Sequence, residues 1–528
     1  MAARLHRLGL RLGTRSVGSS LRGLCVTGLR LSARPVASRD RPRQCENQDR
    51  ALHRTAFPKR ARTGKPQSMN EPLIQPDRGQ EAIAIHLVDK AGFGDFARKL
   101  NAQQRAALAA QKFTGAGYQV GVVPDGDSWF AVGGVKNPTE LSSWCMAKLA
   151  EVLPAGTYRR ADGEIGAALH GWQTAQYRFT RYRDDKDAEG PRILLTEDVR
   201  RIEPAIAEAR AVNMVRDLVN TPAEDMGPAA LEEQAEKIAK AHGAVLSVTK
   251  GEALEREYPM VHAVGRAAAR SHAPRMLHMV WGDEKAPVVA IVGKGVCFDS
   301  GGLDIKPASG MLLMKKDMGG GAHALALADL VMGSGLPVRL HVLVPAVENA
   351  IAGNAFRPGD VLKSRQGLTV EIGNTDAEGR LILADALTRA SEENPDLIVD
   401  FATLTGAARV ALGPDLPALM ARRDETAEAL MAAGKAHGDE CWRLPLPESY
   451  AEWLKSDVAD IINAHSNGYA GASVAGLFLE RFVAPGIDWA HFDTFAWRPA
   501  SKPGRPKGGD ALGLRAAWYM LRGRYAAE

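Results

Sequence analysis

Two short, uninterrupted apolar runs in the second half of the chain most constrain its fold. Residues Val288–Val292 are apolar throughout and almost entirely β-branched, and Leu397–Val399 is similar. Continuous apolar runs suit strands that are buried on both faces. Helical patterns separate such runs, as where Leu383, Leu387 and Ala390 fall on one face. The sequence therefore predicts an α/β fold with a mostly parallel central sheet flanked by helices.

The length of the chain indicates more than one domain, because 528 residues exceed the size at which a single hydrophobic core stops growing. We expect a basic, non-structural extension over residues 1–68 and a smaller accessory α/β domain over residues 69–196. The larger α/β domain is expected over residues 197–528. A helical pattern over Ile202–Val219 is expected to connect the two domains.

Positive charge is concentrated at the amino-terminal end. Residues 1–68 contain sixteen Lys and Arg against Asp40, Glu46 and Asp49, so the net charge of +5 belongs to this segment and the remainder is mildly acidic. An acidic body offers no electrostatic footprint for nucleic acid. No stretch approaches the ~18 continuous apolar residues of a membrane-spanning helix. We expect neither a membrane nor a nucleic-acid partner for the folded body.

The role of the basic extension stays open. Its first 39 residues contain eight Arg and no acid, which is also typical of an organelle transit peptide, and translation from Met69 would remove the segment altogether. The five cysteines are scattered and form neither a disulfide framework nor a metal knuckle. A cytoplasmic location is expected, with an organelle as the alternative if residues 1–68 target the chain.

Chemically active side chains follow the strand patterns. One cluster comes after Val288–Val292, and a second precedes a helix expected to start near Leu381. Ligands of such sheets bind beyond the carboxyl ends of the strands. The side chains that the architecture would bring there are Lys294, Asp299, Lys306, Asp317, Asp376, Glu378 and Arg380.

Four converging carboxylates would repel one another unless a cation neutralised them. A pair of divalent ions is the simplest remedy, and oxygen-rich ligation suits magnesium, manganese or zinc. Two such ions can share carboxylates, polarise a carbonyl and bind a nucleophilic water.

Each of these candidate residues also has a purely structural explanation. Thr375–Glu378 fits a helix capping box, Asp317 fits a helix cap, and Lys294 and Lys306 fit solvated surface lysines. The glycines form no phosphate-binding motif, and neither His-Glu-x-x-His nor Gly-x-Ser-x-Gly occurs. Cys297 fits a small buried hydrophobe better than a nucleophile.

The two clusters resemble the signature of the leucine aminopeptidase, or cytosol aminopeptidase, family of two-metal exopeptidases. The likeness is carried by Val292–Gly295, Phe298–Gly302 and the highly specific Asn374–Leu381, and it covers roughly Asn220–Leu514. It implies a metal-dependent aminopeptidase that releases single, preferably apolar residues such as Leu from short peptides. It also implies a homohexamer, which nothing in the sequence itself demonstrates.

The resemblance further implies a role for each site residue. One manganese or zinc ion would be held by Lys294, Asp299, Asp317 and Glu378, and a second by Asp299, Asp376 and Glu378. Lys294 can ligate only when neutral, so the adjacent dications must depress its pKa. Lys306 would stabilise the oxyanion, and Arg380 would anchor a bicarbonate ion that serves as general base. The first side chain of the substrate would bind Met314, Thr403, Leu404 and Gly406.

Three features depart from the family pattern. Leu312 stands where many members carry an acid, and Gly321–His323 replaces a small apolar run. Phe495–Gly509 is unusually rich in Pro, Lys, Arg and Gly and is expected to be a mobile loop near the site or an assembly contact. Two other functions stay open: a scaffold or DNA-binding protein, supported by the basic extension alone, and a metal-dependent hydrolase of non-peptide amides.

Overall fold

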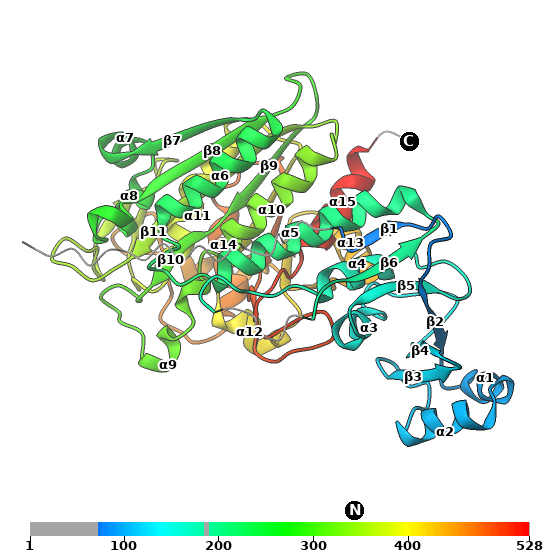
Figure 1. Cartoon of the computed structure of the whole chain (residues 1–528). Helices are drawn as coiled ribbons and strands as arrows, with labels where there is room; N and C mark the ends of the chain where they lie inside the picture. The colour runs from blue at the N-terminus through cyan, green and yellow to red at the C-terminus, as the bar shows by residue number, and fades with distance from the viewer. Residues whose placement is uncertain (1–71, 184–188, 527–528) are drawn as a thin grey trace, which may run out of the picture. The chain divides into compact units, whose positions relative to one another are not determined.

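The computed structural model describes residues 72–183 and 189–526 (Figure 1). The expectations for residues 1–68 lie outside these ranges. None of the helices in the described residues is long and apolar enough to cross a membrane.

Residues 74–196 contribute a six-stranded sheet to the described part of the chain, in the order β1-β6-β5-β2-β4-β3. Its strands pair in parallel except for the antiparallel β3–β4 edge. The strands are β1 Ile74–Pro76, β2 Ile83–Val88, β3 Val120–Asp125, β4 Ser128–Gly134, β5 Gly156–Arg160 and β6 Arg192–Thr196, and the helices are α1 Phe93–Lys99, α2 Ala102–Ala110, α3 Ala147–Val152 and α4 Ala168–Ala175.

A larger sheet follows, with nine strands within the described ranges. Its centre, β18-β14-β9-β11, is parallel, while β7, β8 and β15 run antiparallel to their inner neighbours. Its strands are β7 Val245–Lys250, β8 Arg275–Trp281, β9 Val288–Gly293, β10 Gly295–Asp299, β11 Arg339–Asn349, β14 Leu397–Ala402, β15 Ala418–Ala421, β16 Trp442–Arg443 and β18 Asp488–Asp493. The predicted fold class is confirmed.

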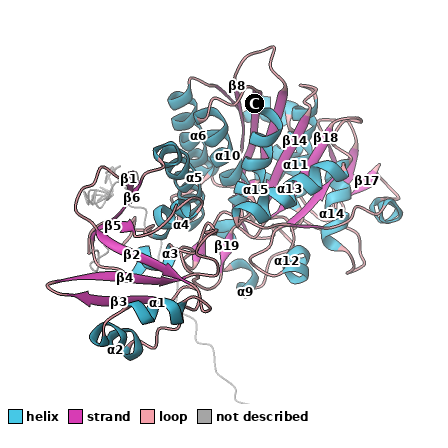
Figure 2. Ribbon diagram, turned by 90° about the vertical axis from the view of Figure 1, so that its right-hand side faces the viewer, coloured by secondary structure: helices cyan, strands magenta, loops and turns pink. Residues whose placement is uncertain are grey.

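Helices cover both faces of this sheet (Figure 2). Successive β9 side chains point to opposite faces, so Val289 and Ile291 join one core while Ala290 and Val292 join the other. One core is packed by α5 Ile202–Asn220, α6 Pro228–His242, α10 Gly319–Gly333, α13 Asp424–His437 and α15 Leu514–Tyr525. The other is packed by α7 Gly251–Glu257, α8 Pro259–Gly265, α11 Glu378–Ser391 and α14 Gly471–Glu480.

Smaller elements complete the fold. A short sheet joins β12 Val361–Lys363, β13 Thr369–Glu371 and β17 Ile461–Ile462. Helices α9 Ala308–Met311 and α12 Gly406–Leu412 and the 3₁₀ turn η3 Met314–Lys316 lie in the segments between the larger elements. The predicted connecting helix corresponds to α5, and the domain boundary at residue 196 stays a prediction.

The Phe495–Gly509 segment is held by contacts within itself and with the amino-terminal part of the chain. Its strands β19 Trp497–Arg498 and β20 Gly508–Gly509 pair with each other. At its centre the Gly504 amide donates to Glu151, and Arg505 stacks over the Trp144 ring. The segment therefore contacts the region around α3 in the amino-terminal part of the chain, and its part in assembly stays a prediction.

Candidate metal centre and active site

The predicted site residues lie where strands of the larger sheet end. Lys294 directly follows β9, Asp299 is the last residue of β10, and Thr403 directly follows β14. Asp317 lies between η3 and α10, and Glu378 is the first residue of α11. The helix thus begins three residues before the expected start near Leu381.

The four predicted carboxylates gather around two lysines. Ligand atoms of Asp299, Asp376 and Glu378 all lie within 4.8 Å of one another. Lys294 Nζ joins Asp317 to this group, at 2.6 Å from Asp317 Oδ2 and 2.8 Å from Glu378 Oε1. Lys306 Nζ lies 2.8 Å from Asp299 Oδ2 and also contacts Asp376.

Both lysines are part of this cluster and not of the solvated surface. Lys294 is only 3% exposed, and the Lys306 side chain is 14% exposed. Burial opposes the charge on Lys294, but the carboxylates of Asp317, Glu378 and Asp299 outweigh it and raise the pKa of Lys294. The depressed pKa that the family resemblance implies for this lysine therefore depends on the added charge of metal ions.

Burial and mutual repulsion disfavour the ionised form of two of these carboxylates. Burial and then the charge of Asp299 raise the pKa of Glu378 to about 8 and that of Asp376 to about 6. The two lysines thus leave part of the negative charge uncompensated. Cations are the complement that such a site favours.

The orientation of the carboxylate oxygens fits metal ligands. Asp317 Oδ2, Asp376 Oδ1 and Glu378 Oε1 are buried without a hydrogen bond, although lysine ammonium groups lie at ion-pair distance. Hydrogen bonds from neighbouring side chains fix the Oδ1 atoms of Asp299 and Asp317. Asn349 Nδ2 donates to Asp299 Oδ1 at 2.9 Å, and Thr403 Oγ1 donates to Asp317 Oδ1 at 2.8 Å. Such outer partners orient ligands toward a metal.

The capping interpretations are wrong. Helix α11 has no side-chain cap, and the Thr375 hydroxyl instead donates to the Gly301 carbonyl. Asp317 does not cap α10, which begins after Met318 without a side-chain cap. Cys297 is buried and its thiol pKa is raised by burial, as expected of a small hydrophobe.

Arg380 lies beside the cluster but outside the cavity lining. Its Nη1 donates to the Asn463 carbonyl at 2.6 Å, and its Nε is buried without a partner. Burial lowers the pKa of Arg380 to about 10. The guanidinium is therefore held in place at one end and has an unused donor at Nε.

A cavity of about 280 Å³ opens onto the metal cluster. Its lining includes the four predicted substrate residues, Met314, Thr403, Leu404 and Gly406. It also includes Arg409, whose guanidinium stacks over the Phe495 ring at 4.6 Å. Of the three departures from the family pattern, Leu312 and Gly321–His323 do not line this cavity, whereas Phe495 of the third does.

Leu312 and His323, which belong to the first two departures, lie in opposite environments. Leu312 is 79% exposed. His323 is fully buried, with Nδ1 bonded to the Gly319 carbonyl and Nε2 accepting from the Leu512 amide. These two partners fix a neutral imidazole that supports the first turn of α10.

Sequence reasoning missed several residues of the site. Asn349 had a usable signal, because it ends a long apolar strand and faces the same sheet edge as the ligands. Asn463, Lys316 and Arg409 had none, since no periodic pattern marks them. Lys316 is buried at 3.3 Å from Asp317, and burial lowers its pKa.

Comparison with known proteins identifies the family of this chain. A model of the cytosol aminopeptidase family, catalytic domain, matches residues 213–517. The chain belongs to the cytosol aminopeptidase family. A model of the M17 aminopeptidase N-terminal domain matches residues 83–194.

Relatives of this family are similar over most of the chain. A probable cytosol aminopeptidase from Roseiflexus castenholzii is 36% identical over 84% of this chain and 94% of its own length. The crystal structure of cytosol aminopeptidase from Coxiella burnetii matches with a TM-score of 0.81 and 44% identity, over 86% of this chain and all of that one. The bottromycin maturation enzyme BotP in complex with Mn matches with a TM-score of 0.75 and 33% identity, over 84% and 99%. The chain is thus a hydrolase, a metal-dependent aminopeptidase.

Proposed function

We propose that this aminopeptidase uses two metal ions to release single, preferably apolar residues such as Leu from the amino terminus of short peptides. One observation carries the proposal. Asp299, Asp376 and Glu378 meet within 4.8 Å, and Lys294 lies between Glu378 and Asp317. Carboxylates this close to one another disfavour ionisation unless a cation neutralises them.

The proposed cofactors are two divalent ions, manganese or zinc. The first would be held by Lys294, Asp299, Asp317 and Glu378, and the second by Asp299, Asp376 and Glu378. Ions bound here would supply Lewis acidity toward the scissile carbonyl and lower the pKa of water. The unpartnered oxygens of Asp317, Asp376 and Glu378 support this arrangement.

Residues around the cluster would position the reacting groups. The Lys306 ammonium, cationic beside Asp299, would donate to the oxyanion that develops on the substrate. The Arg380 guanidinium would hold bicarbonate in the place of the general base, with its unpartnered Nε as one donor. Asp317 would pair with the free α-amine of the substrate, which restricts cleavage to the amino end.

The size and lining of the cavity support the substrate class. A volume of about 280 Å³ accommodates little more than one residue, since drug-sized ligands occupy sites of roughly 300–1,000 Å³. Met314 and Leu404 give the lining apolar surface, which favours an apolar first side chain. Gly406 leaves room beside them.

We further propose a homohexamer in the cytoplasm, with an organelle as the alternative location. Three large apolar side chains, Val410, Leu312 and Tyr469, are 87%, 79% and 75% exposed in the single chain. Assembly would cover such surface. Mass photometry tests the hexamer, and mass spectrometry of the native amino terminus tests the location, because targeting by residues 1–68 would leave a cleaved end.

Metal exchange with matched substrates tests the reaction. Protein stripped with a chelator and refilled with manganese or zinc is expected to cleave leucine amide and to leave N-acetyl-leucine amide intact. Glu378→Ala is expected to lose bound metal and activity, whereas the exposed Glu425→Ala keeps both. An active Glu378→Ala enzyme, or cleavage of the acetylated amide, would contradict the proposal.

A further inference from the structure

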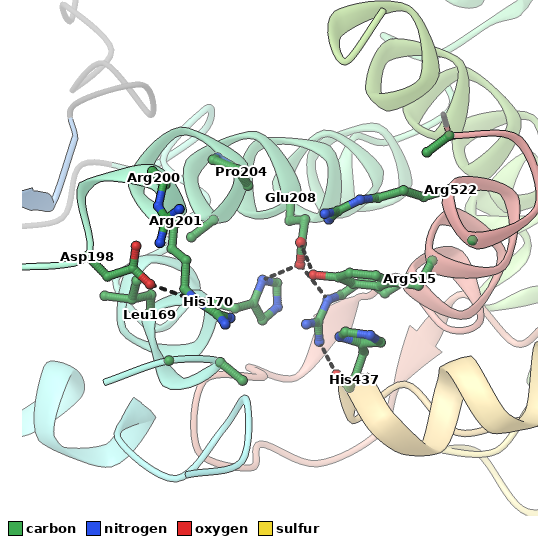
Figure 3. A pocket seen from close by; sticks show the side chains of 16 residues that line it. Leu169, His170, Asp198, Arg200, Arg201, Pro204, Glu208, His437, Arg515 and Arg522 are labelled. Atoms are coloured by element: carbon green, nitrogen blue, oxygen red, sulfur yellow. Dashed lines mark hydrogen bonds and ion pairs between the residues drawn. The ribbon is translucent and has the colours of Figure 1, made fainter. Parts of the chain in front are cut away.

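A second cavity lies away from the metal cluster and shares none of its lining residues. It measures about 690 Å³ and is lined from both parts of the chain (Figure 3). One wall comes from α4, the 3₁₀ turn η1 Val199–Arg201 and the start of α5, and the other from the end of α13 and from α15. A molecule bound here would contact the accessory domain and the catalytic domain together.

Arginines dominate this cavity. Arg200 and Arg201 lie on one side of Glu208, and Arg515 and Arg522 lie on the side of α15 (Figure 3). Four guanidinium groups therefore face two carboxylates within the lining.

Both lining carboxylates are already paired. Glu208 accepts from Arg515 Nε at 3.0 Å and from the Tyr519 hydroxyl. Asp198 pairs with Arg201 Nε at 2.9 Å. Arg200 and Arg522 are left without an acidic partner among residues 72–183 and 189–526, although Arg522 stacks over the Tyr519 ring. Both guanidinium groups are exposed to solvent, so the cavity lining presents two positive charges that no described carboxylate pairs.

A buried imidazole adds an independent sign of a ligand. His170 is 2% exposed and lines the cavity, yet neither ring nitrogen has a hydrogen-bond partner within the described structure. Its Nδ1 lies 3.7 Å from Glu208 Oε2, which is too long for a hydrogen bond. Burial and the charge of Arg515 lower its pKa, so the ring is neutral and offers one donor and one acceptor.

We propose that this cavity binds a small organic phosphate. Guanidinium groups match phosphate oxygens in geometry and charge, and the unpaired Arg200 and Arg522 approach from opposite walls. His170 supplies a further donor. The volume exceeds that of inorganic phosphate several-fold and leaves room for an organic group beside the stacked rings of His437 and Tyr519. Because the ligand would bridge both walls, its binding would raise the melting temperature.

Calorimetric titration of the full-length, manganese-loaded protein tests this site, with pyrophosphate, adenosine monophosphate and citrate as probes at constant ionic strength. Wild-type protein is expected to bind both phosphates saturably and more tightly than citrate. Arg200→Gln with Arg522→Gln is expected to weaken phosphate binding on the order of tenfold or more, because two charge-assisted contacts are lost. Leucine amide cleavage should be unchanged.

The matched control replaces two exposed arginines elsewhere, Arg98→Gln with Arg256→Gln, whose side chains are 76% and 71% exposed. It is expected to bind phosphates as wild type does. Equal affinity in both double variants would place the bound anion elsewhere, such as at the metal centre, and would overturn the proposal. Binding of citrate as tight as that of pyrophosphate, or no saturable binding at millimolar phosphate, would also overturn it.

Discussion

Replacing Gly379 with alanine tests how closely α11 must approach Lys294. An added Cβ would lie 2.6 Å from both Cε and Nζ of Lys294. Ordinary carbon contacts begin near 3.5 Å, so the lysine would have to move by about 1 Å. Its Nζ lies 2.6 Å from Asp317 and 2.8 Å from Glu378, and a shift of this size breaks at least one of these contacts.

The expected loss follows from that displacement. A misplacement of about 1 Å in a catalytic site costs roughly 100-fold in rate, equivalent to about 2.7 kcal/mol of activation free energy. The helix itself should not weaken, because alanine is favoured over glycine within helices by about 0.5–1 kcal/mol. Lower activity would therefore report on the site and not on the stability of α11.

The assay measures kcat/KM for leucine amide, together with bound metal per chain by elemental analysis. Gly379→Ala is expected to lower kcat/KM about 100-fold. Gly353→Ala is the matched control, since a Cβ there would meet no atom within 4 Å. A Gly379→Ala enzyme with the kcat/KM and metal content of wild type would refute the close-approach reasoning.

Three further predictions concern other parts of the molecule. Arg380→Ala should slow leucine amide cleavage while elemental analysis still finds both metals, and loss of metal would contradict the proposed role. Asp510→Ala should lower the free energy of unfolding by about 3–5 kcal/mol in chemical denaturation. The change removes the carboxylate that pairs with buried Arg216 at 2.9 Å and leaves buried Arg498, now 2.8 Å from Asp510, with Asp415 alone. Wild-type stability of the variant would show that these contacts contribute little. Burial lowers the pKa of His323 from 6.5 to about 4, so its neutral form stabilises the fold fully above pH 6.5 and this contribution is lost as the pH falls toward 4. The unfolding free energy of the wild-type protein is expected to decrease between pH 7 and pH 5, and this decrease should be about 2 kcal/mol smaller in His323→Gln. An equal decrease in both proteins would refute the assigned pKa.

Prediction from the sequence was most successful where pattern and chemistry are local. Strands β9 and β14 have continuous apolar runs because both faces are buried, and that signal needs no knowledge of neighbours. Prediction failed where a hydrogen-bond partner distant in sequence determines the position of a side chain. Thr375 is spaced for a capping box, yet its hydroxyl bonds to Gly301, more than seventy residues away. Arg409 and Asn463 reach the site from segments without periodicity.

The sequence by itself determined the chemical identity of the candidate ligands and their place after strand ends, because both follow from residue type and short-range pattern. Only the tertiary structure decided which carboxylates share a point, that Lys294 lies between two of them, and that Arg200 and Arg522 face one cavity across more than three hundred residues. Electrostatic interaction depends on distance and on burial, and both are set when the chain folds.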